Sequence, residues 1–281
     1  MKLSAMKLLT VLVLLPLAAS ARTPLTADVT YYATPSGGGD CLTPATACTP
    51  QEAWNGIRDR LDLNCHRVVV EMAEGNYGTL DLIGALTGPC GADAVTFRGN
   101  VEHPERVNVD GGRSNAITVH EGAWVKLDGL QLASAEPDFN FGGRGLVVWD
   151  AGRALVGTLA FGLCTTSAIG AGGGGEIHAE RSALYINGLT AMFGIAEDGG
   201  KLWLNGASIT PTAPYSAFTN GMFHTSRGGL IDLSGTILEP GPPLFGYIAI
   251  AESNSVIVIL GMRYPPNMGR PQVRYGGQII P

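Results

Sequence analysis

Lysine is almost absent from this sequence. It occurs at only four positions, Lys2, Lys7, Lys126 and Lys201, and no segment gathers arginines into a basic cluster. The formal net charge at pH 7 is −6. Proteins that bind nucleic acids need clustered positive charge to neutralise phosphates, so the composition argues against nucleic acid as a partner.

Long hydrophobic runs are missing after the first residues. Lys2 and Lys7 precede an apolar run over residues 8–19, and a small-residue cleavage pattern ends at Ala21. The run is too short to cross a bilayer comfortably, so we predict a secretory signal peptide over residues 1–21. We therefore expect an exported protein, extracellular or periplasmic, with no membrane span.

Cysteines are few, and their spacing matches no metal-binding motif. The five cysteines include no CxxC or Cys/His arrangement, so we expect no metal and no other cofactor. In an exported chain cysteines are first interpreted as disulfides. We predict the pairs Cys41–Cys48, which brackets a short loop, and Cys65–Cys90, which flanks the first strand region. Cys164 remains as a buried free thiol in an apolar segment.

The sequence does contain a recurring phrase bounded by glycines. Its clearest copies span residues 122–129, 199–206 and 228–235, and weaker copies begin at Ala151, Gly174 and Asn254. Successive copies start 29, 23, 25, 29 and 26 residues apart. A strand-like repeat of this period predicts a stacked solenoid, with strand, corner, strand and turn in each coil, as in a parallel β-helix.

One convincing helix precedes the repeats. Thr49 and Glu52 form a capping-box pattern around Pro50, and apolar residues follow at helical spacing, which predicts a helix over residues 50–63. This helix would cover the open end of the solenoid, where unpaired strand edges are otherwise exposed. We expect a turn at residues 76–78 and strands at 29–33, 68–72, 80–83, 94–97 and 107–109.

Four regions follow from these features. They are a signal peptide over 1–21, an N-terminal loop and capping helix over 22–67, a parallel β-helix over 68–262, and an irregular C-terminal cap or tail over 263–281.

Alignment of the repeat copies separates inward from outward positions. The fourth and sixth positions are apolar in every copy and should face the core, because side chains alternate along a strand. The third, fifth and seventh positions should then face outward. In neighbouring coils we expect one flat face to carry Glu176, His178, Glu180, Lys201, Trp203, Asn205 and Asp232.

This face has three possible uses. The indole of Trp203 could carry the apolar side of a sugar ring while His178, Lys201 and Asn205 meet its hydroxyls. Two of the acids Glu176, Glu180 and Asp232 could serve as the acid and base of glycoside cleavage. The same polar residues would also give an exposed sheet its solubility.

A second row of polar residues lies at the corner before each phrase. It contains carboxylates such as Glu197 and Asp198, which could hold Ca²⁺, but Arg227 and a glycine pair interrupt it. A solvated turn is the other interpretation of this row.

The chain resembles the right-handed parallel β-helix proteins of the pectate-lyase-like superfamily, a group of secreted and phage-associated proteins. The similar segments are residues 31–48, with Tyr-Tyr-Ala-Thr-Pro-Ser-Gly and Asp-Cys-Leu-Thr-Pro-Ala-Thr-Ala-Cys, then residues 68–77, 116–119 and 122–130. The resemblance implies an all-β, single-stranded right-handed parallel β-helix. Members include polysaccharide lyases, glycoside hydrolases, and spike and adhesion proteins.

The resemblance implies no particular activity. The Asn-Thr-Asp, Asp-Asp and Gly-His-Gly signatures of polygalacturonase-like members are absent, as are the Trp-x-Asp-His and Arg-x-Pro-x-x-Arg stretches of pectate lyases. Our first hypothesis is a secreted protein that binds polysaccharide or acts at a cell or virion surface. The alternatives are a polysaccharide lyase or glycoside hydrolase, and a structural spike or adhesin. In the last case a homo-oligomer would form through Leu155, Leu230, Val256 and Val258.

Overall fold

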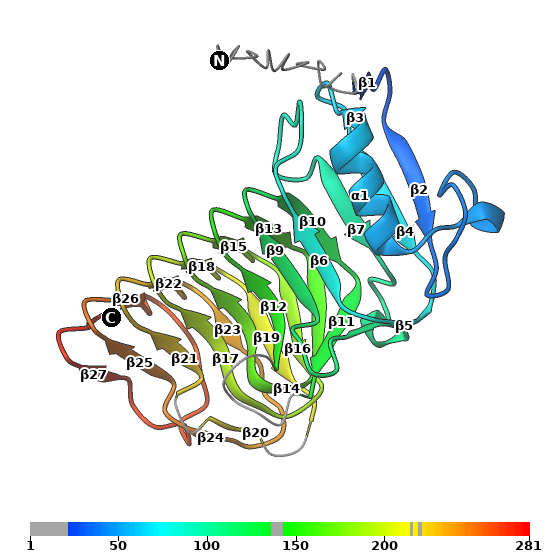
Figure 1. Ribbon diagram of the computed structural model, residues 1–281. Coiled ribbons are helices and arrows are strands. Elements are labelled where there is room, and N and C mark those ends of the chain that lie inside the picture. Colours follow the sequence, from blue (N-terminus) through cyan, green and yellow to red (C-terminus); the bar gives the residue numbers. More distant parts are fainter. Residues whose placement is uncertain (1–21, 136–142, 214–215, 219–220) are drawn as a thin grey trace, which may run out of the picture.

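The protein is a parallel β-helix. The computed structural model describes residues 22–135, 143–213, 216–218 and 221–281. The predicted signal peptide therefore lies outside the described residues. Figure 1 shows the coils stacked along one axis, from helix α1 (Pro50–Arg60) at one end to strand β27 (Gln272–Arg274) near the other. The fold class predicted from the sequence, an all-β right-handed parallel β-helix with an N-terminal capping helix, is confirmed.

The first wall of the solenoid is a ten-stranded parallel sheet, here called sheet 1. Its strands, in spatial order, are β2 (Val29–Ala33), β4 (Val68–Met72), β7 (Val95–Arg98), β10 (Trp124–Asp128), β13 (Arg153–Val156), β15 (Glu176–His178), β18 (Lys201–Trp203), β22 (Leu230–Asp232), β26 (Val256–Val258) and β28 (Gln278–Ile280). The predicted repeat phrases supply the strands from β10 to β26.

The other two walls belong to one 14-stranded sheet, because the long strand β14 (Thr158–Ala171) bends from one wall into the other. Sheet 2 contains β5 (Gly75–Tyr77), β8 (Val107–Asp110), β11 (Leu130–Ser134), the first part of β14, β16 (Ala183–Ile186), β19 (Ser208–Pro211) and β23 (Ile237–Leu238). Sheet 3 contains β6 (Leu80–Ile83), β9 (Ile117–His120), β12 (Arg144–Val148), the second part of β14, β17 (Thr190–Ala196), β21 (Phe223–Thr225), β25 (Ala249–Glu252) and β27.

Each complete coil thus has three strands, where the repeat had indicated two. The strand predicted at 107–109 is β8 of sheet 2. Within the repeats the sheet 2 strands were missed although they also alternate, as in Leu184 and Ile186, which are buried on either side of half-buried Tyr185. The expected turn at residues 76–78 is also wrong. Residues 75–77 form β5, because Tyr77 is buried and its hydroxyl donates a 2.6 Å hydrogen bond to the carbonyl of Ala73.

The core runs the length of the solenoid between the three walls. The fourth and sixth repeat positions face it, and Val125, Ile177, Leu202 and Ile231 are completely buried. Phe161, Phe193 and Phe223 stack edge to face along the axis, with ring centroids 5.6 and 5.8 Å apart. Stacking of like residues in successive coils buries one continuous apolar column.

The corners between sheets need left-handed backbone. Gly199 and Gly206 have φ angles of 77° and 66°, which explains the glycines that bound each repeat phrase. The first corner residue need not be glycine, since Asp198 and Arg227 also have positive φ.

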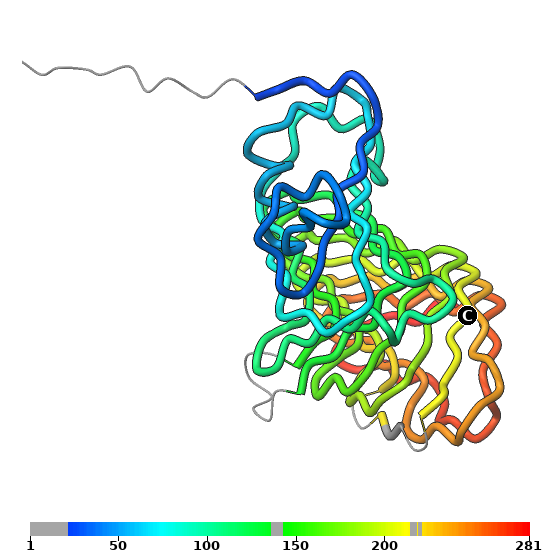
Figure 2. Tube along the Cα trace, turned by 90° about the vertical axis from the view of Figure 1, so that its right-hand side faces the viewer, coloured from blue at the N-terminus to red at the C-terminus, as the bar shows by residue number. Residues whose placement is uncertain are grey.

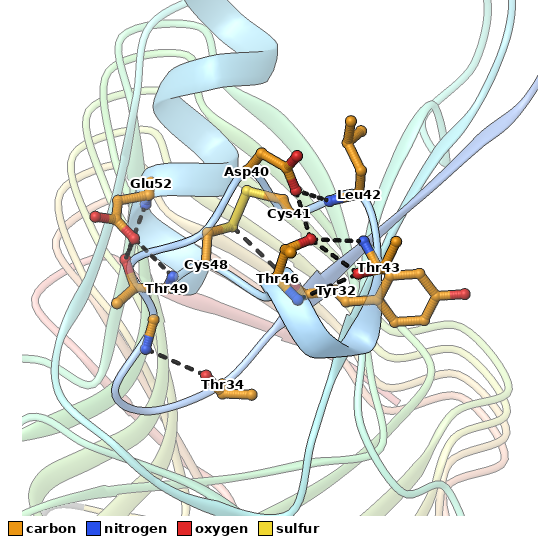
Figure 3. Close-up of a disulfide and its surroundings, with 11 residues drawn as sticks. Tyr32, Thr34, Asp40, Cys41, Leu42, Thr43, Thr46, Cys48, Thr49 and Glu52 are labelled. Atoms are coloured by element: carbon orange, nitrogen blue, oxygen red, sulfur yellow. Dashed lines mark hydrogen bonds between the residues drawn. A yellow bond between two sulfur atoms is a disulfide. The ribbon is translucent and has the colours of Figure 1, made fainter.

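The N-terminal end of the stack is closed by α1, as expected (Figure 2). The predicted capping box is present, with Thr49 and Glu52 exchanging hydrogen bonds (Figure 3). Trp54 projects from the buried face of this helix and is fully buried, and its indole N–H donates a 3.1 Å hydrogen bond to the carbonyl of Ile83. The helix ends at Arg60 instead of residue 63 because the chain turns into β3 (Leu61–Asp62), which pairs with β1 (Thr23–Pro24).

All cysteine predictions agree with the structure. Cys41–Cys48 closes the loop that carries the short 3₁₀ helix Pro44–Thr46 (Figure 3). Cys65–Cys90 forms the second disulfide, and Cys164 is free and buried. Burial raises the pKa of the Cys164 thiol to about 12, which keeps it protonated.

The C-terminal region differs from the expected irregular tail. Strands β27 and β28 extend sheets 3 and 1 by a further coil. Two minor strands, β20 (Ser216–Phe218) and β24 (Leu244–Gly246), pair with each other and belong to none of the three walls. Nearer the N-terminus, a short 3₁₀ helix spans Pro104–Arg106. The prolines after residue 263 break the repeat pattern on the sheet 2 side of this coil. The coil was therefore not predicted from the sequence, although its strands in sheets 3 and 1 are present.

Candidate functional site

The outward face of sheet 1 gathers the residues singled out in the sequence. The strand register places Glu176 beside Lys201, and places His178, Trp203 and Asp232 in one row across β15, β18 and β22. Glu180 and Asn205 follow their strands and are tied to this row by hydrogen bonds. All seven predicted residues therefore lie together on this face.

Glu176 is the centre of charge on this face. Its carboxylate accepts a 2.8 Å hydrogen bond from Nζ of Lys201 and lies 3.6 Å from Nε of Arg153 and 3.3 Å from Nε2 of His178. The hydrogen bond from Lys201 is the main cause that holds the pKa of Glu176 below its ordinary value, against a smaller opposing effect of burial. Glu176 is therefore ionised at neutral pH, which does not suit a general acid.

His178 connects Glu176 to the aromatic part of the face. Its two ring nitrogens lie 3.3 Å from Glu176 and 3.1 Å from Glu180, so both carboxylates orient the imidazole. The imidazole stacks on the indole of Trp203, with centroids 6.2 Å apart and planes 23° apart. His178 thus lies next to one ring face of Trp203.

Asp232 is held by neutral donors. Oδ2 accepts a 2.6 Å hydrogen bond from Nδ2 of Asn205, and Oδ1 accepts hydrogen bonds from the backbone N–H and the hydroxyl of Ser234 at 2.9 and 2.6 Å. Within the described residues no lysine, arginine or histidine forms an ion pair with Asp232. The carboxylate is therefore well positioned without a neutralising cation.

Two further residues belong to the same face but were not among the predicted site residues. The guanidinium of Arg153 lies 5.4 Å from the ring centroid of Trp124, on the neighbouring strand, and also approaches Glu176. Both occupy the third position of the repeat, so the alignment that identified Lys201 could also have identified them. Leu155, Leu230, Val256 and Val258, considered for a subunit contact, are half-buried on this face.

The corner row is an ion-pair network. Glu197 accepts hydrogen bonds from Nη2 of Arg144 at 3.1 Å and Nη2 of Arg227 at 2.8 Å, and Arg227 also binds Asp198. Arg144 in turn lies 5.3 Å over the ring of Trp149. Two arginines thus already satisfy Glu197, and no group of acidic, histidine or cysteine side chains suited to a metal occurs in the described part of the chain.

The side chains of Arg144 and Trp149 lie over two glycines, Gly170 near the end of β14 and Gly172 just after it. A Cβ atom on Gly172 would overlap the ring of Trp149, and one on Gly170 would contact Arg144. Sequence reasoning missed Arg144, because no repeat position marks it. The two glycines were a signal, since they leave room for large neighbours on an outward face.

Solved structures that resemble the chain are only distantly similar to it. Two of the solved structures that resemble the chain are crystal structures of the pectin methylesterase from Aspergillus niger, one deglycosylated and one with an N-acetylglucosamine stub. Each is 11% identical, with TM-scores of 0.44 and 0.43, and each match covers 92% of this chain and 88% of the other. No protein-family model matches the sequence, and no curated protein matches it either.

In the part of the chain that the structure describes, no helix has both the length and the apolar character needed to cross a membrane.

Proposed function

We propose that this protein binds a polysaccharide along the outward face of sheet 1, with Trp203 as the platform for a sugar ring. The observation that carries the proposal is the stack of His178 on Trp203, bordered by the hydrogen-bonding groups of Lys201, Asn205 and Asp232. Sugars are bound in this way because an indole covers the apolar side of a pyranose while polar neighbours meet its hydroxyls.

Binding is favoured over cleavage by the charge state of Glu176. Hydrolysis by a carboxylate pair needs one partner that stays protonated near neutral pH. The pKa of Glu176 is instead lowered, mainly by its hydrogen bond from Lys201. A lytic or hydrolytic role for Glu180 and Asp232 is treated as an outcome of the experiment below.

The proposed site of action is outside the cell or in the periplasm. Two disulfides support this location, because such bonds form and persist in oxidising compartments. The predicted signal peptide at residues 1–21 agrees with it.

Retention on polysaccharides tests the proposal. The full chain would be passed over insoluble cellulose, chitin, chitosan and cross-linked pectate, while released reducing and unsaturated ends are measured. We expect retention by at least one polymer without release of ends. Trp203→Ala should weaken binding at least about tenfold, since a tryptophan that a ligand covers contributes a large share of the binding energy.

Tyr185→Ala is the matched control. Tyr185 is an aromatic residue in the same solenoid, but it lies half-buried on the outward side of sheet 2. Its removal should leave retention unchanged. Equal losses in the two variants, or no retention at all, would contradict binding at sheet 1. Release of ends that Asp232→Asn abolishes would identify an enzyme.

A further inference from the structure

The free side of Trp203 opens toward Asp232. In the row across sheet 1, Trp203 lies between His178 on β15 and Asp232 on β22. Because His178 stacks on the side of the indole nearer β15, the other ring face is directed toward β22. The side chain there is the much shorter Asp232. A sugar ring that stacks on the free face of Trp203 would therefore lie next to the Asp232 carboxylate.

The Asp232 carboxylate has no charged neighbour among the outward residues of its own strand and of the two strands that follow it in sheet 1. The outward residues of β22, β26 and β28 are Leu230, Asp232, Val256, Val258, Gln278 and Ile280. Asp232 is thus the one charged side chain among them. Lys201, on the neighbouring strand, is paired with Glu176 at 2.8 Å. A ligand at Trp203 therefore meets a negative charge that no residue on these three strands neutralises.

Two independent features of this place favour a positive charge. Asp232 offers carboxylate oxygens to a charged donor, and such charge-assisted hydrogen bonds are stronger than neutral ones. The indole face attracts cations through its quadrupole, and tryptophan is the best residue for this. A polyanion would instead meet Asp232 and a chain whose net charge is already −6.

We infer that the polysaccharide bound by sheet 1 carries free amino groups, as a polymer of glucosamine does. The inference rests on the proposed function, and it adds the charge of the ligand. The sugar ring stacks on Trp203, and its ammonium group pairs with Asp232. An N-acetylated polymer of the same backbone keeps the ring but loses the charge, and a galacturonate polymer reverses the charge.

Calorimetric titration of the full chain with three soluble hexamers tests this inference. They are the glucosamine hexamer, its fully N-acetylated form and the galacturonate hexamer, each at low and high salt and at a mildly acidic pH that protonates the amines. We expect the glucosamine hexamer to bind at least about tenfold more tightly than the other two, with an advantage that shrinks at high salt. Asp232→Asn should remove most of this advantage and leave binding of the N-acetylated hexamer unchanged.

Asp128→Asn is the matched control, because it removes one carboxylate of sheet 1 that likewise accepts a backbone hydrogen bond, from Thr158 at 2.8 Å. It should leave the preference intact. Equal losses in Asp232→Asn and Asp128→Asn would reveal unspecific attraction of a polycation and overturn the inference. Trp203-dependent binding of the N-acetylated hexamer with equal affinity would overturn it too, but would leave the proposed function standing. Failure of all three hexamers to bind would overturn the inference, while the proposed function would still be decided by the retention test on the four polymers.

Discussion

Arg144 and Glu197 are 53 residues apart in the sequence, yet Nη2 of Arg144 donates a 3.1 Å hydrogen bond to Oε1 of Glu197. Arg144 begins β12, and Glu197 directly follows β17. Strand β14 separates these two strands, so the pair spans three successive coils. The side chains of Arg144 and Glu197 are only 18% and 13% exposed. The pair thus fastens neighbouring coils to one another from outside the core.

Glu197→Gln should therefore destabilise the solenoid. Removing the charge from a partly buried partner weakens a charge-assisted hydrogen bond and should cost about 1.5–3 kcal/mol. Chemical denaturation followed by circular dichroism would measure the loss. Glu105→Gln is the control, because Glu105 also forms an ion pair, with His103, but both side chains are half exposed. Its loss should stay below about 1 kcal/mol, and a similar loss in both variants would contradict the role given to Glu197.

Trp54→Ala should weaken the N-terminal cap. Trp54 is completely buried, and its ring centroid lies 6.5 Å from that of Phe97. Its truncation would leave a cavity and remove one of the two hydrogen bonds that the Ile83 carbonyl accepts, the other coming from Arg58. We expect a loss of about 3–5 kcal/mol in the free energy of unfolding. Asn55→Ala, at the neighbouring exposed position of the helix, should change stability by less than about 0.5 kcal/mol.

Gly172→Ala should displace the ring of Trp149, because the added Cβ would overlap it. Overpacking of this kind costs about 1–3 kcal/mol, and the tryptophan fluorescence should change as the ring moves. Gly78→Ala tests the opposite case, since a Cβ there meets nothing within 4 Å and the backbone has no positive φ. That variant should be neutral or slightly more stable, with unchanged fluorescence. Unchanged fluorescence in Gly172→Ala would show that Trp149 does not lie over Gly172.

The two disulfides should contribute unequally to stability. Cys41–Cys48 closes a separation of 7 residues and Cys65–Cys90 one of 25. In the chain-entropy account the longer loop stabilises more, about 3.5 against about 2.4 kcal/mol. Denaturation of the two double serine variants would measure the difference. A larger loss on removing Cys41–Cys48 would mean that native packing of its loop outweighs chain entropy.

Acid should destabilise the protein partly through Glu176. The folded-state pKa of Glu176 is lowered from 4.5, chiefly by the hydrogen bond from Lys201. A group with a depressed pKa contributes stability that is fully present above its unfolded pKa and is lost as the pH falls through the folded value. Melting temperatures of Glu176→Gln should therefore fall less steeply than those of the natural chain below pH 4.5. Parallel curves for both proteins would exclude Glu176 as a contributor.

Much of the candidate site could be predicted from the sequence, because it depends on local alternation. Glu176, Lys201 and Trp203 share one face since side chains in a strand alternate, and since the repeat period places successive strands side by side. The glycines of the repeat also indicated where the corners between strands lie. The helix that closes the stack was likewise predictable from Thr49 and Glu52, whose reciprocal hydrogen bonds depend only on residues three apart.

Other relationships were decided only when the chain closed into coils. The third strand of the repeat coils was missed because its short alternating segment resembles the strands beside it in sequence. The contact of Arg144 with Glu197 crosses the second part of β14, where two glycines leave space for large side chains. Likewise, only the stack on His178 shows which face of Trp203 is free. The sequence by itself determined which residues face outward, because that follows from a period of two along one strand. The tertiary structure decided which of them touch, because that depends on how far the chain travels between one coil and the next.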